Sequence, residues 1–234
     1  MKKEVIGAHV GRLTPRQEAV DALADAIRGA EVGHPVRVAV DGPDAAGKTT
    51  LADELAEALR TEGREVIRAS IDGFHRPRAH RYARGAESPI GYFEDSFDHE
   101  ALRHVLLDPL GPLGTRRYRT RVFDFRTDQP VDEVEREADE RAVLIFDGVF
   151  LLRAELRDAW DYRIFVEAPF DETLRRAVIR DAELMGGADA VRQRYRDRYT
   201  PGQELYLAAA NPAELADVVV HNVDPRRPRL TFRT

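Results

Sequence analysis

Short apolar runs alternate along this chain with segments whose apolar residues recur at helical spacing. The runs that predict buried strands are residues 36–40, 65–71, 142–147, 162–166 and 216–220. Between the first two runs, Leu51, Leu55 and Leu59 fall on one face of a predicted helix. Strands that alternate with helices predict an α/β fold, with a doubly wound, mainly parallel sheet flanked by helices in one domain over residues 36–234.

The first 35 residues predict a separate helix that packs on the core at the edge of the sheet. The sequence Thr14-Pro15-Arg16-Gln17 combines an N-cap, a proline at the first helical position and a capping-box glutamine. The apolar residues that then repeat at helical spacing are Val20, Leu23, Ala24 and Ile27. A regulatory role for this segment is left open.

The remaining segments carry weaker patterns. Residues 73–97 predict a long irregular loop, and a loop of that length inside a domain is more often functional than idle. Asp98 predicts the cap of a short helix, and residues 116–125 predict a strand or hairpin with one basic face. Asp171 predicts the N-cap of an arginine-bearing helix that Gly186-Gly187 ends.

Composition narrows the class of protein. The 234 residues are 43% hydrophobic, which is enough for one good core, and the absence of cysteine excludes a disulfide framework and a thiolate metal site. We expect a cytoplasmic protein, because no signal peptide is visible and no apolar run approaches the ~20 residues of a membrane span. The net charge of -6 argues against a general nucleic-acid partner.

The candidate chemistry begins between the first strand and the first leucine-bearing helix. Residues 42–49 read Gly-x-x-x-x-Gly-Lys-Thr, so backbone N–H groups and a helix start converge there, which favours bound polyphosphate. Lys48 would reach the β- and γ-phosphates, and the Thr49 hydroxyl would bind Mg²⁺. A chance glycine turn is the alternative, but the full spacing and both flanks favour a nucleoside triphosphate site. The predicted nucleotide-binding residues are Gly42, Pro43, Asp44, Ala45, Ala46, Gly47, Lys48, Thr49 and Thr50.

Two aspartates follow predicted strands, where the ligand crevice of an open α/β sheet lies. Asp72 is the candidate base for an acceptor hydroxyl and a further candidate ligand of Mg²⁺. Asp147, after the cleanest apolar run, has the position of an acid that holds Mg²⁺ directly or through water. The alternative for each is a strand-end turn residue, since Asp-Gly favours turns.

Arginines supply the candidate cations. Arg176 and Arg180 share one face of their predicted helix, so residues 175–200 could form a lid that closes over the nucleotide. A solvated basic face is the alternative. The clusters at residues 76–84 and 116–121 fit either an acidic acceptor or simple surface positions.

With these motifs in place, residues 36–225 resemble the uridine kinase, phosphoribulokinase and pantothenate kinase family of P-loop small-molecule kinases, and bacterial uridine-kinase-like proteins above all. Besides the phosphate loop, six segments match in order: residues 70–75, 92–98, 123–125, 146–149, 175–181 and 216–219. The resemblance implies that Asp72 is the catalytic carboxylate and that Lys48, Arg176 and Arg180 act on the phosphates. It also implies ATP or GTP with Mg²⁺, a small hydroxylated acceptor and, by analogy, a homodimer.

The chain departs from the family at the acceptor side. Phe123 and Asp128 stand where uridine and cytidine kinases carry the tyrosine and histidine that read the base. Tyr92 stands where they carry a ribose-binding aspartate, and replacement of that aspartate by Glu94 or Asp95 is left open. The predicted acceptor-binding residues are His75, Arg76, Tyr92, Phe123 and Asp128. Uridine or cytidine is the first expectation for the acceptor. Nicotinamide riboside, pantothenate or a sugar phosphate stays open, as does a nucleotide-dependent regulatory module that transfers nothing.

Overall fold

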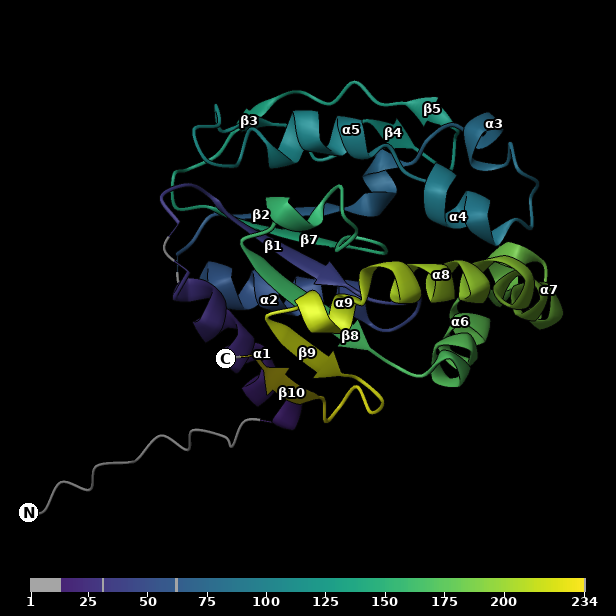
Figure 1. The fold of residues 1–234 in the computed structure, drawn as a ribbon. Coiled ribbons are helices and arrows are strands. Elements are labelled where there is room, and N and C mark those ends of the chain that lie inside the picture. The colour runs from purple at the N-terminus through teal and green to yellow at the C-terminus, as the bar shows by residue number, and fades with distance from the viewer. Residues whose placement is uncertain (1–13, 31, 62, 234) are drawn as a thin grey trace, which may run out of the picture.

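The computed structural model describes residues 14–30, 32–61 and 63–233, and a six-stranded sheet lies at its centre (Figure 1). The strands are, in spatial order, β10 (Arg229–Phe232), β9 (Val218–His221), β8 (Tyr162–Glu167), β1 (Val36–Asp41), β7 (Val143–Gly148) and β2 (Val66–Ser70). All neighbours run parallel except β10, which pairs antiparallel with β9. The predicted α/β fold with a mainly parallel sheet is confirmed.

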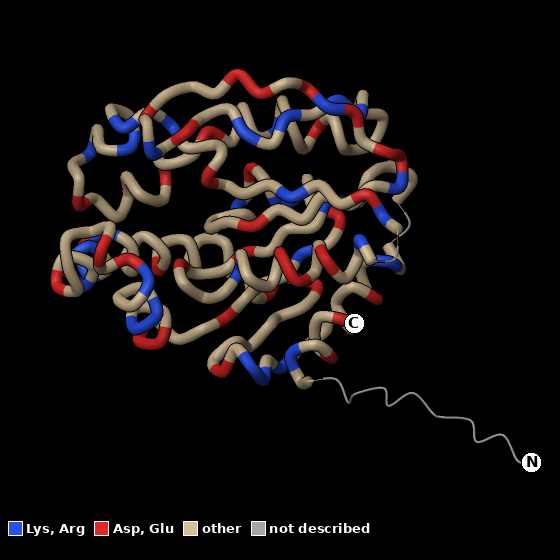
Figure 2. The backbone as a smooth tube through the Cα atoms, turned by 180° about the vertical axis from the view of Figure 1, so that it is seen from behind, with Lys and Arg blue, Asp and Glu red and all other residues tan. Residues whose placement is uncertain are grey.

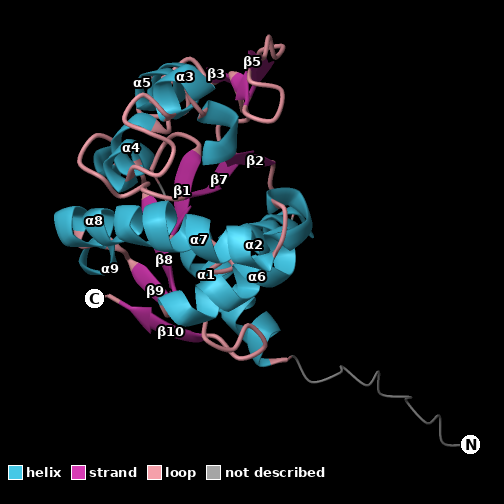
Figure 3. Cartoon of the chain, turned by 90° about the vertical axis from the view of Figure 1, so that its right-hand side faces the viewer, coloured by secondary structure: helices cyan, strands magenta, loops and turns pink. Residues whose placement is uncertain are grey.

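The two faces of the sheet build two separate parts of the core. Successive side chains of a strand point to opposite faces, so Val36, Val38 and Val40 of β1 pack with one set of helices and Ala39 with the other. On the first face lie α1 (Pro15–Arg28) and α2 (Lys48–Thr61). On the second lie α4 (Pro89–Asp95), α5 (His99–Leu102), the π-helical turn η2 (Arg103–Leu107) and α8 (Thr200–Ala210), as Figure 3 shows from the side.

The remaining elements surround these layers. The helices are η1 (Ile71–Phe74), α3 (Arg78–Arg81), η3 (Arg157–Ala159), α6 (Phe170–Met185), α7 (Ala188–Arg194), η4 (Tyr195–Tyr199) and α9 (Pro212–Leu215). Two short antiparallel ladders pair β3 (Arg117–Tyr118) with β6 (Arg136–Glu137) and β4 (Phe123–Asp124) with β5 (Gln129–Pro130). A third, smaller cluster consists of Ala177 of α6, Val191 of α7 and Tyr195 of η4, and Ala45 of the glycine loop packs against it.

Two predictions about local structure are wrong, and one strand was not predicted. Residues 73–97 are only partly irregular, because they contain the end of η1 together with α3 and α4. Helices this short show no periodicity in the sequence. Asp171 does not cap α6, since the helix begins one residue earlier, after Pro169, and the carboxylate falls in its first turn. Strand β10 was not predicted, because its residues are mostly exposed and two of its four positions are polar.

Several start signals are confirmed. Thr14 caps α1, with Gln17 N–H donating to Thr14 Oγ1 at 3.3 Å and Gln17 Oε1 accepting from Thr14 N at 2.9 Å. Asp98 Oδ1 accepts from Ala101 N at 2.9 Å and starts α5. In the described part of the chain no helix is both long and apolar enough to cross a membrane. Basic and acidic positions are interspersed along the backbone (Figure 2).

Candidate functional site

The glycine loop joins the end of β1 to the start of α2, in the middle of the sheet. Gly42 has φ 149°, and a Cβ there would meet the Val166 carbonyl oxygen at 2.3 Å. Gly47 has φ 100°, and a Cβ there would meet Asn222 Nδ2 at 2.5 Å. Both positions therefore require glycine, for conformation and for space. The loop is held between β8 and the end of β9, with its backbone leading into the helix start.

Lys48 is the one lysine after residue 3 in a chain that otherwise uses arginine. Its side chain is buried, and Nζ donates to the Pro43 carbonyl oxygen across the loop at 2.7 Å. Burial lowers the pKa of the ammonium, while the nearby carboxylates of Asp44, Asp41, Asp147 and Asp72 oppose that shift. The Lys48 ammonium is thus held inside the glycine loop by the Pro43 carbonyl oxygen.

Thr49 and Asp147 meet at the neighbouring strand end. Asp147 aligns with Val40 of β1 and Ser70 of β2 in the sheet register, and its Oδ2 accepts from Thr49 Oγ1 at 2.6 Å. Its other oxygen accepts from Arg68 Nη2 at 3.0 Å, a contact that was not predicted from the sequence.

A hydroxyl beside a carboxylate fits Mg²⁺, which prefers oxygen ligands and usually takes only one or two from protein. Among the described residues no group of three or more His, Asp or Glu side chains could hold a metal alone. The arrangement therefore suits a metal that arrives with phosphate oxygens. Mg²⁺ binding by Thr49, Asp147 or Asp72 stays a prediction.

Asp72 lies in η1, directly after β2, and its side chain is 62% exposed. His75 Nε2 lies 3.5 Å from Asp72 Oδ1. Desolvation raises the pKa of Asp72, but the hydrogen bond and charge of His75, with the charges of Lys48 and Arg180, outweigh it, so that the pKa is below its ordinary value. The site thus contains an ionised carboxylate, Asp72, whose charge is stabilised by Lys48 of the glycine loop and by Arg180.

Aromatic rings hold His75 next to this carboxylate. Its imidazole stacks on Phe97, with ring centroids 4.6 Å apart, and contacts Phe125 at 4.9 Å. The hairpin that carries Phe125 is fixed to η1 by a hydrogen bond from Val122 N to the Gly73 carbonyl oxygen of 2.9 Å. In the sequence Phe125 is only one residue of the family-matched segment 123–125, and its contact with His75 depends on the fold.

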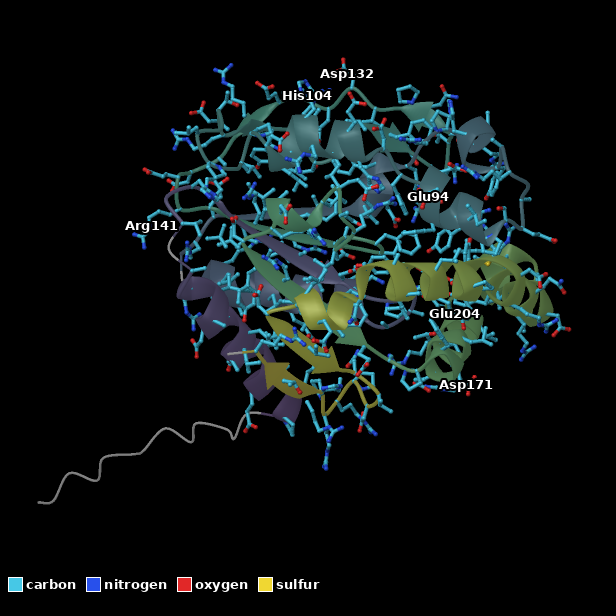
Figure 4. The ribbon with its side chains drawn as sticks, in the orientation of Figure 1. Glu94, His104, Asp132, Arg141, Asp171 and Glu204 are labelled. Atoms are coloured by element: carbon cyan, nitrogen blue, oxygen red, sulfur yellow. The ribbon has the colours of Figure 1, made fainter. Side chains whose placement is uncertain are left out.

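Tyr92 is buried and is bound to the glycine loop. Its hydroxyl donates to Asp44 Oδ2 at 2.6 Å, and its ring packs against Phe150 and Tyr199 at 5.0 and 4.9 Å between centroids. The side chain thus lies where α4 meets α8, the two helices marked by Glu94 and Glu204 in Figure 4. Its direct partner is therefore the phosphate loop, and contact with an acceptor stays a prediction.

The other predicted acceptor residues lie on the hairpin and beside it. Phe123 is buried and pairs with Pro130 across β4 and β5. Asp128 accepts from Arg78 N at 2.8 Å and from Arg81 Nη2 at 3.1 Å, which fastens the hairpin to α3. Arg76 is held through its backbone N–H, which donates to the Ser96 carbonyl oxygen at 2.9 Å. Their acceptor-binding roles stay predictions.

The two predicted lid arginines have different surroundings. Arg176 donates to the Asn222 carbonyl oxygen at 2.8 Å, to the Ala46 carbonyl oxygen at 3.3 Å and to Glu172 at 2.8 Å, so it braces the glycine loop. Arg180 pairs with the adjacent Asp181 at 2.7 Å, a bond that raises the pKa of its guanidinium, and its side chain is 60% exposed. Arg180 is thus the more accessible of the two cations.

Helix α8 contributes residues that were not predicted from the sequence. Gln203 Nε2 donates to Asp44 Oδ2 at 2.9 Å, and Gln203 Oε1 accepts from Asp44 N at 3.1 Å. Tyr206 donates to the fully buried Asp41 and accepts from Leu152 N at 3.0 Å. The spacing of Gln203 and Tyr206 places both on one helix face, but about 160 residues separate them from Asp44 and Asp41.

A phosphate loop on the central strand of a parallel sheet, with its lysine, a Thr–Asp pair and a strand-end carboxylate around it, defines a P-loop kinase. Residues 37–223 match the Cytidylate kinase-like family, and the chain belongs to that family. The predicted resemblance to P-loop small-molecule kinases is thereby confirmed.

Three relatives illustrate the range of similarity. The chain is 27% identical to a uridine kinase of Chlamydia pneumoniae over 187 residues, which cover 79% of this chain and 80% of the relative. It is 25% identical to a structure described as a candidate uridine kinase from Bacillus stearothermophilus, with a TM-score of 0.69 and coverage of 87% and 97%. A candidate fructose transport system kinase from Silicibacter shares the fold, with a TM-score of 0.68, 24% identity and coverage of 86% and 96%.

Proposed function

We propose that this protein transfers the γ-phosphate of ATP, bound with Mg²⁺, to a hydroxyl group of a nucleoside, with uridine or cytidine as the first candidates. The observation that carries the proposal is Asp72, an accessible ionised carboxylate at a strand end, within the field of Lys48 and Arg180. A protein that only binds nucleotide has no need of such a group. We place the activity in the cytoplasm.

Each residue would have a distinct role. Asp72 would orient the acceptor hydroxyl and take its proton; its low pKa makes it a weak base, which suffices because a loose phosphoryl-transfer transition state asks mainly for alignment. Lys48 and Arg180 would stabilise charge on the transferred group. Thr49 and Asp147 would hold Mg²⁺, which supplies positive charge to the phosphate oxygens when it is bound.

The identity of the acceptor has less support than the identity of the phosphoryl donor. Loss of a base-reading hydrogen bond removes discrimination between acceptors, and Phe123 and Asp128 already contact other residues of the chain. Relatives are described as uridine kinases or as a fructose transport system kinase, and the family is described as cytidylate-kinase-like. Nicotinamide riboside, pantothenate or a sugar phosphate is therefore the alternative acceptor for the same transfer to a hydroxyl. A nucleoside monophosphate is the alternative of different chemistry, because it would accept the phosphoryl group on its phosphate oxygen.

The first test measures ADP release from Mg-ATP with uridine, cytidine, cytidylate, nicotinamide riboside, pantothenate, fructose or no acceptor. We expect a rate with uridine or cytidine well above the rate without acceptor. A response to another hydroxylated acceptor alone would keep the kinase and replace the nucleoside. A rate that is equal with and without every acceptor would support the regulatory module instead.

Asp72→Asn tests the role of the carboxylate. The change keeps shape but removes the proton acceptor, so we expect kcat to fall by about 10²–10⁴-fold while the Kd for ADP stays within about twofold. Asp158→Asn is the matched control, because the Asp158 side chain is 86% exposed on η3. Unchanged kcat in Asp72→Asn would remove Asp72 as the base.

A further inference from the structure

An open pocket of about 860 Å³ adjoins the glycine loop at Gly47, and neither Asp44 nor a residue of α8 lines it. Gly47 and Thr50 line one end of it, Arg176 and Asn222 line another wall, and residues 224–227 close it beyond β9. Its volume is in the range of small-ligand sites, roughly 300–1,000 Å³. A polyphosphate on the loop would therefore extend its nucleoside end into this pocket.

The start of α1 forms the remaining wall. Thr14, Pro15 and Arg16 line the pocket, although they lie outside the family-matched residues 37–223. Burial of Leu23 and Ile27 against Leu51 and Leu55 of α2 fixes the helix in this position. The helix that precedes the kinase domain thus reaches the edge of the nucleotide site.

Arg16 is the side chain through which α1 contacts the site. Its Nε donates to Glu54 Oε2 at 2.8 Å, its Nη2 lies 2.6 Å from the same oxygen in an ion pair, and its Nη1 donates to Asn222 Oδ1 at 3.5 Å. Asn222 Nδ2 in turn donates to the Ala46 carbonyl oxygen in the glycine loop at 2.7 Å. The Arg16 side chain is only 14% exposed, yet a guanidinium carries more N–H donors than these contacts use.

We infer that Arg16, at the start of α1 and held there by Glu54 of α2, contacts the nucleoside end of the bound nucleotide. The N-terminal helix is thereby part of the nucleotide site. The inference rests on the proposed function for the presence of a nucleotide. It adds a binding residue from outside the kinase domain. The chemical group that Arg16 recognises lies beyond the phosphates, at the ribose or base.

The test compares the Kd of ADP with that of inorganic tripolyphosphate by calorimetry, without acceptor, in the wild type, Arg16→Ala and Arg28→Ala. Arg28 is the control, because it is on the same helix but does not line the pocket. We expect Arg16→Ala to weaken ADP binding about tenfold, to leave tripolyphosphate within about twofold, and Arg28→Ala to change neither. Equal ADP affinity in Arg16→Ala and the wild type would overturn the inference, and so would equal weakening of both ligands, since Arg16 would then act through the phosphate loop.

A second measurement needs no substitution and so does not depend on the variant's folding. Hydrogen exchange of the wild type should show slower exchange of the amides of residues 17–20 with ADP than with tripolyphosphate. Identical protection by the two ligands would contradict the inference. Absence of ADP binding to the wild type would overturn the proposed nucleotide site and this inference together, whereas ADP binding without acceptor-dependent turnover would overturn only the kinase.

Discussion

Asp41 and Tyr206 illustrate what single residues do under the phosphate loop. Asp41 is fully buried at the end of β1, and its carboxylate accepts from Gly42 N at 2.8 Å and from the Tyr206 hydroxyl. Burial raises the pKa of Asp41, while the bonds from Tyr206 and Gly42 and the charge of Lys48 limit the rise. The tyrosine therefore makes a buried negative charge tolerable directly beneath the loop.

We expect Tyr206→Phe to lower the free energy of unfolding by about 2–3 kcal/mol, because it leaves a buried carboxylate and the Leu152 N–H short of a partner. Loss of the Tyr206 bond raises the folded-state pKa of Asp41 further. The folded variant then binds a proton at Asp41 more readily than the wild type does. The decrease in unfolding free energy caused by Tyr206→Phe should therefore be smaller at about pH 5 than at about pH 8. Urea unfolding at both pH values measures it.

Tyr82→Phe is the control for this substitution. The Tyr82 ring contacts the guanidinium of Arg198 with 4.9 Å to the ring centroid, and phenylalanine keeps that ring. We expect a change within about 0.5 kcal/mol. A loss in Tyr206→Phe no larger than in this control would show that Asp41 is not stabilised by the hydroxyl.

At the scale of elements, the junction between α6 and α7 determines the direction in which the chain of the predicted lid continues. Gly186 ends α6 in the left-handed region, with φ 86°, and its N–H donates to the Ala182 carbonyl oxygen. Gly29 also ends a helix, α1, but with φ -71° in the right-handed region. The two glycines occupy equivalent places in their helices with opposite backbone requirements.

Gly186→Ala should therefore cost about 1 kcal/mol of unfolding free energy, since alanine is strained at positive φ. Gly29→Ala should be neutral or stabilising by about 0.4–1 kcal/mol, because its backbone suits alanine and a Cβ there meets ordinary contacts at 3.5 Å or more. Denaturant unfolding of both variants gives the comparison. Equal changes in unfolding free energy in the two variants would mean that the backbone conformation of Gly186 does not require glycine.

At the scale of the molecule, the predicted nucleotide site draws together elements from most of the chain: the loop after β1, α2, the ends of β7 and β9, and α6. A ligand that binds only the folded state stabilises it by mass action. ADP at about 100 times its Kd should add about 2.7 kcal/mol, a rise in Tm of about 5–11 °C for a chain of this size.

Lys48→Ala should abolish most of this ligand-dependent rise, because it removes the ammonium that would contact the phosphates. Each variant is compared with itself, with and without ADP, so a change in basal stability does not confuse the result. Asp158→Asn should show the full rise, since Asp158 lies on the surface. A full rise in Lys48→Ala would place the nucleotide elsewhere on the molecule.

The sequence by itself determined the sheet, its main strands and the phosphate loop. Each depends on local information: an apolar run of strand length, helical spacing of leucines, and a glycine motif between them. The strand-end positions of Asp72 and Asp147 follow from the same pattern, because the carboxyl ends of parallel strands meet at one edge of the sheet. The start of α1 was also readable, since a capping box is a contact within four residues.

Only the tertiary structure decided which side chains pair. Tyr92 and Gln203 converge on Asp44, Tyr206 on Asp41 and Arg68 on Asp147, from segments with no common motif. The same holds for Arg16, whose place at the pocket follows from the packing of α1 on α2. Pairing across long stretches of chain depends on how packed layers bring surfaces together. A local sequence pattern predicts which residues are buried, but it does not predict which side chains they contact in the core.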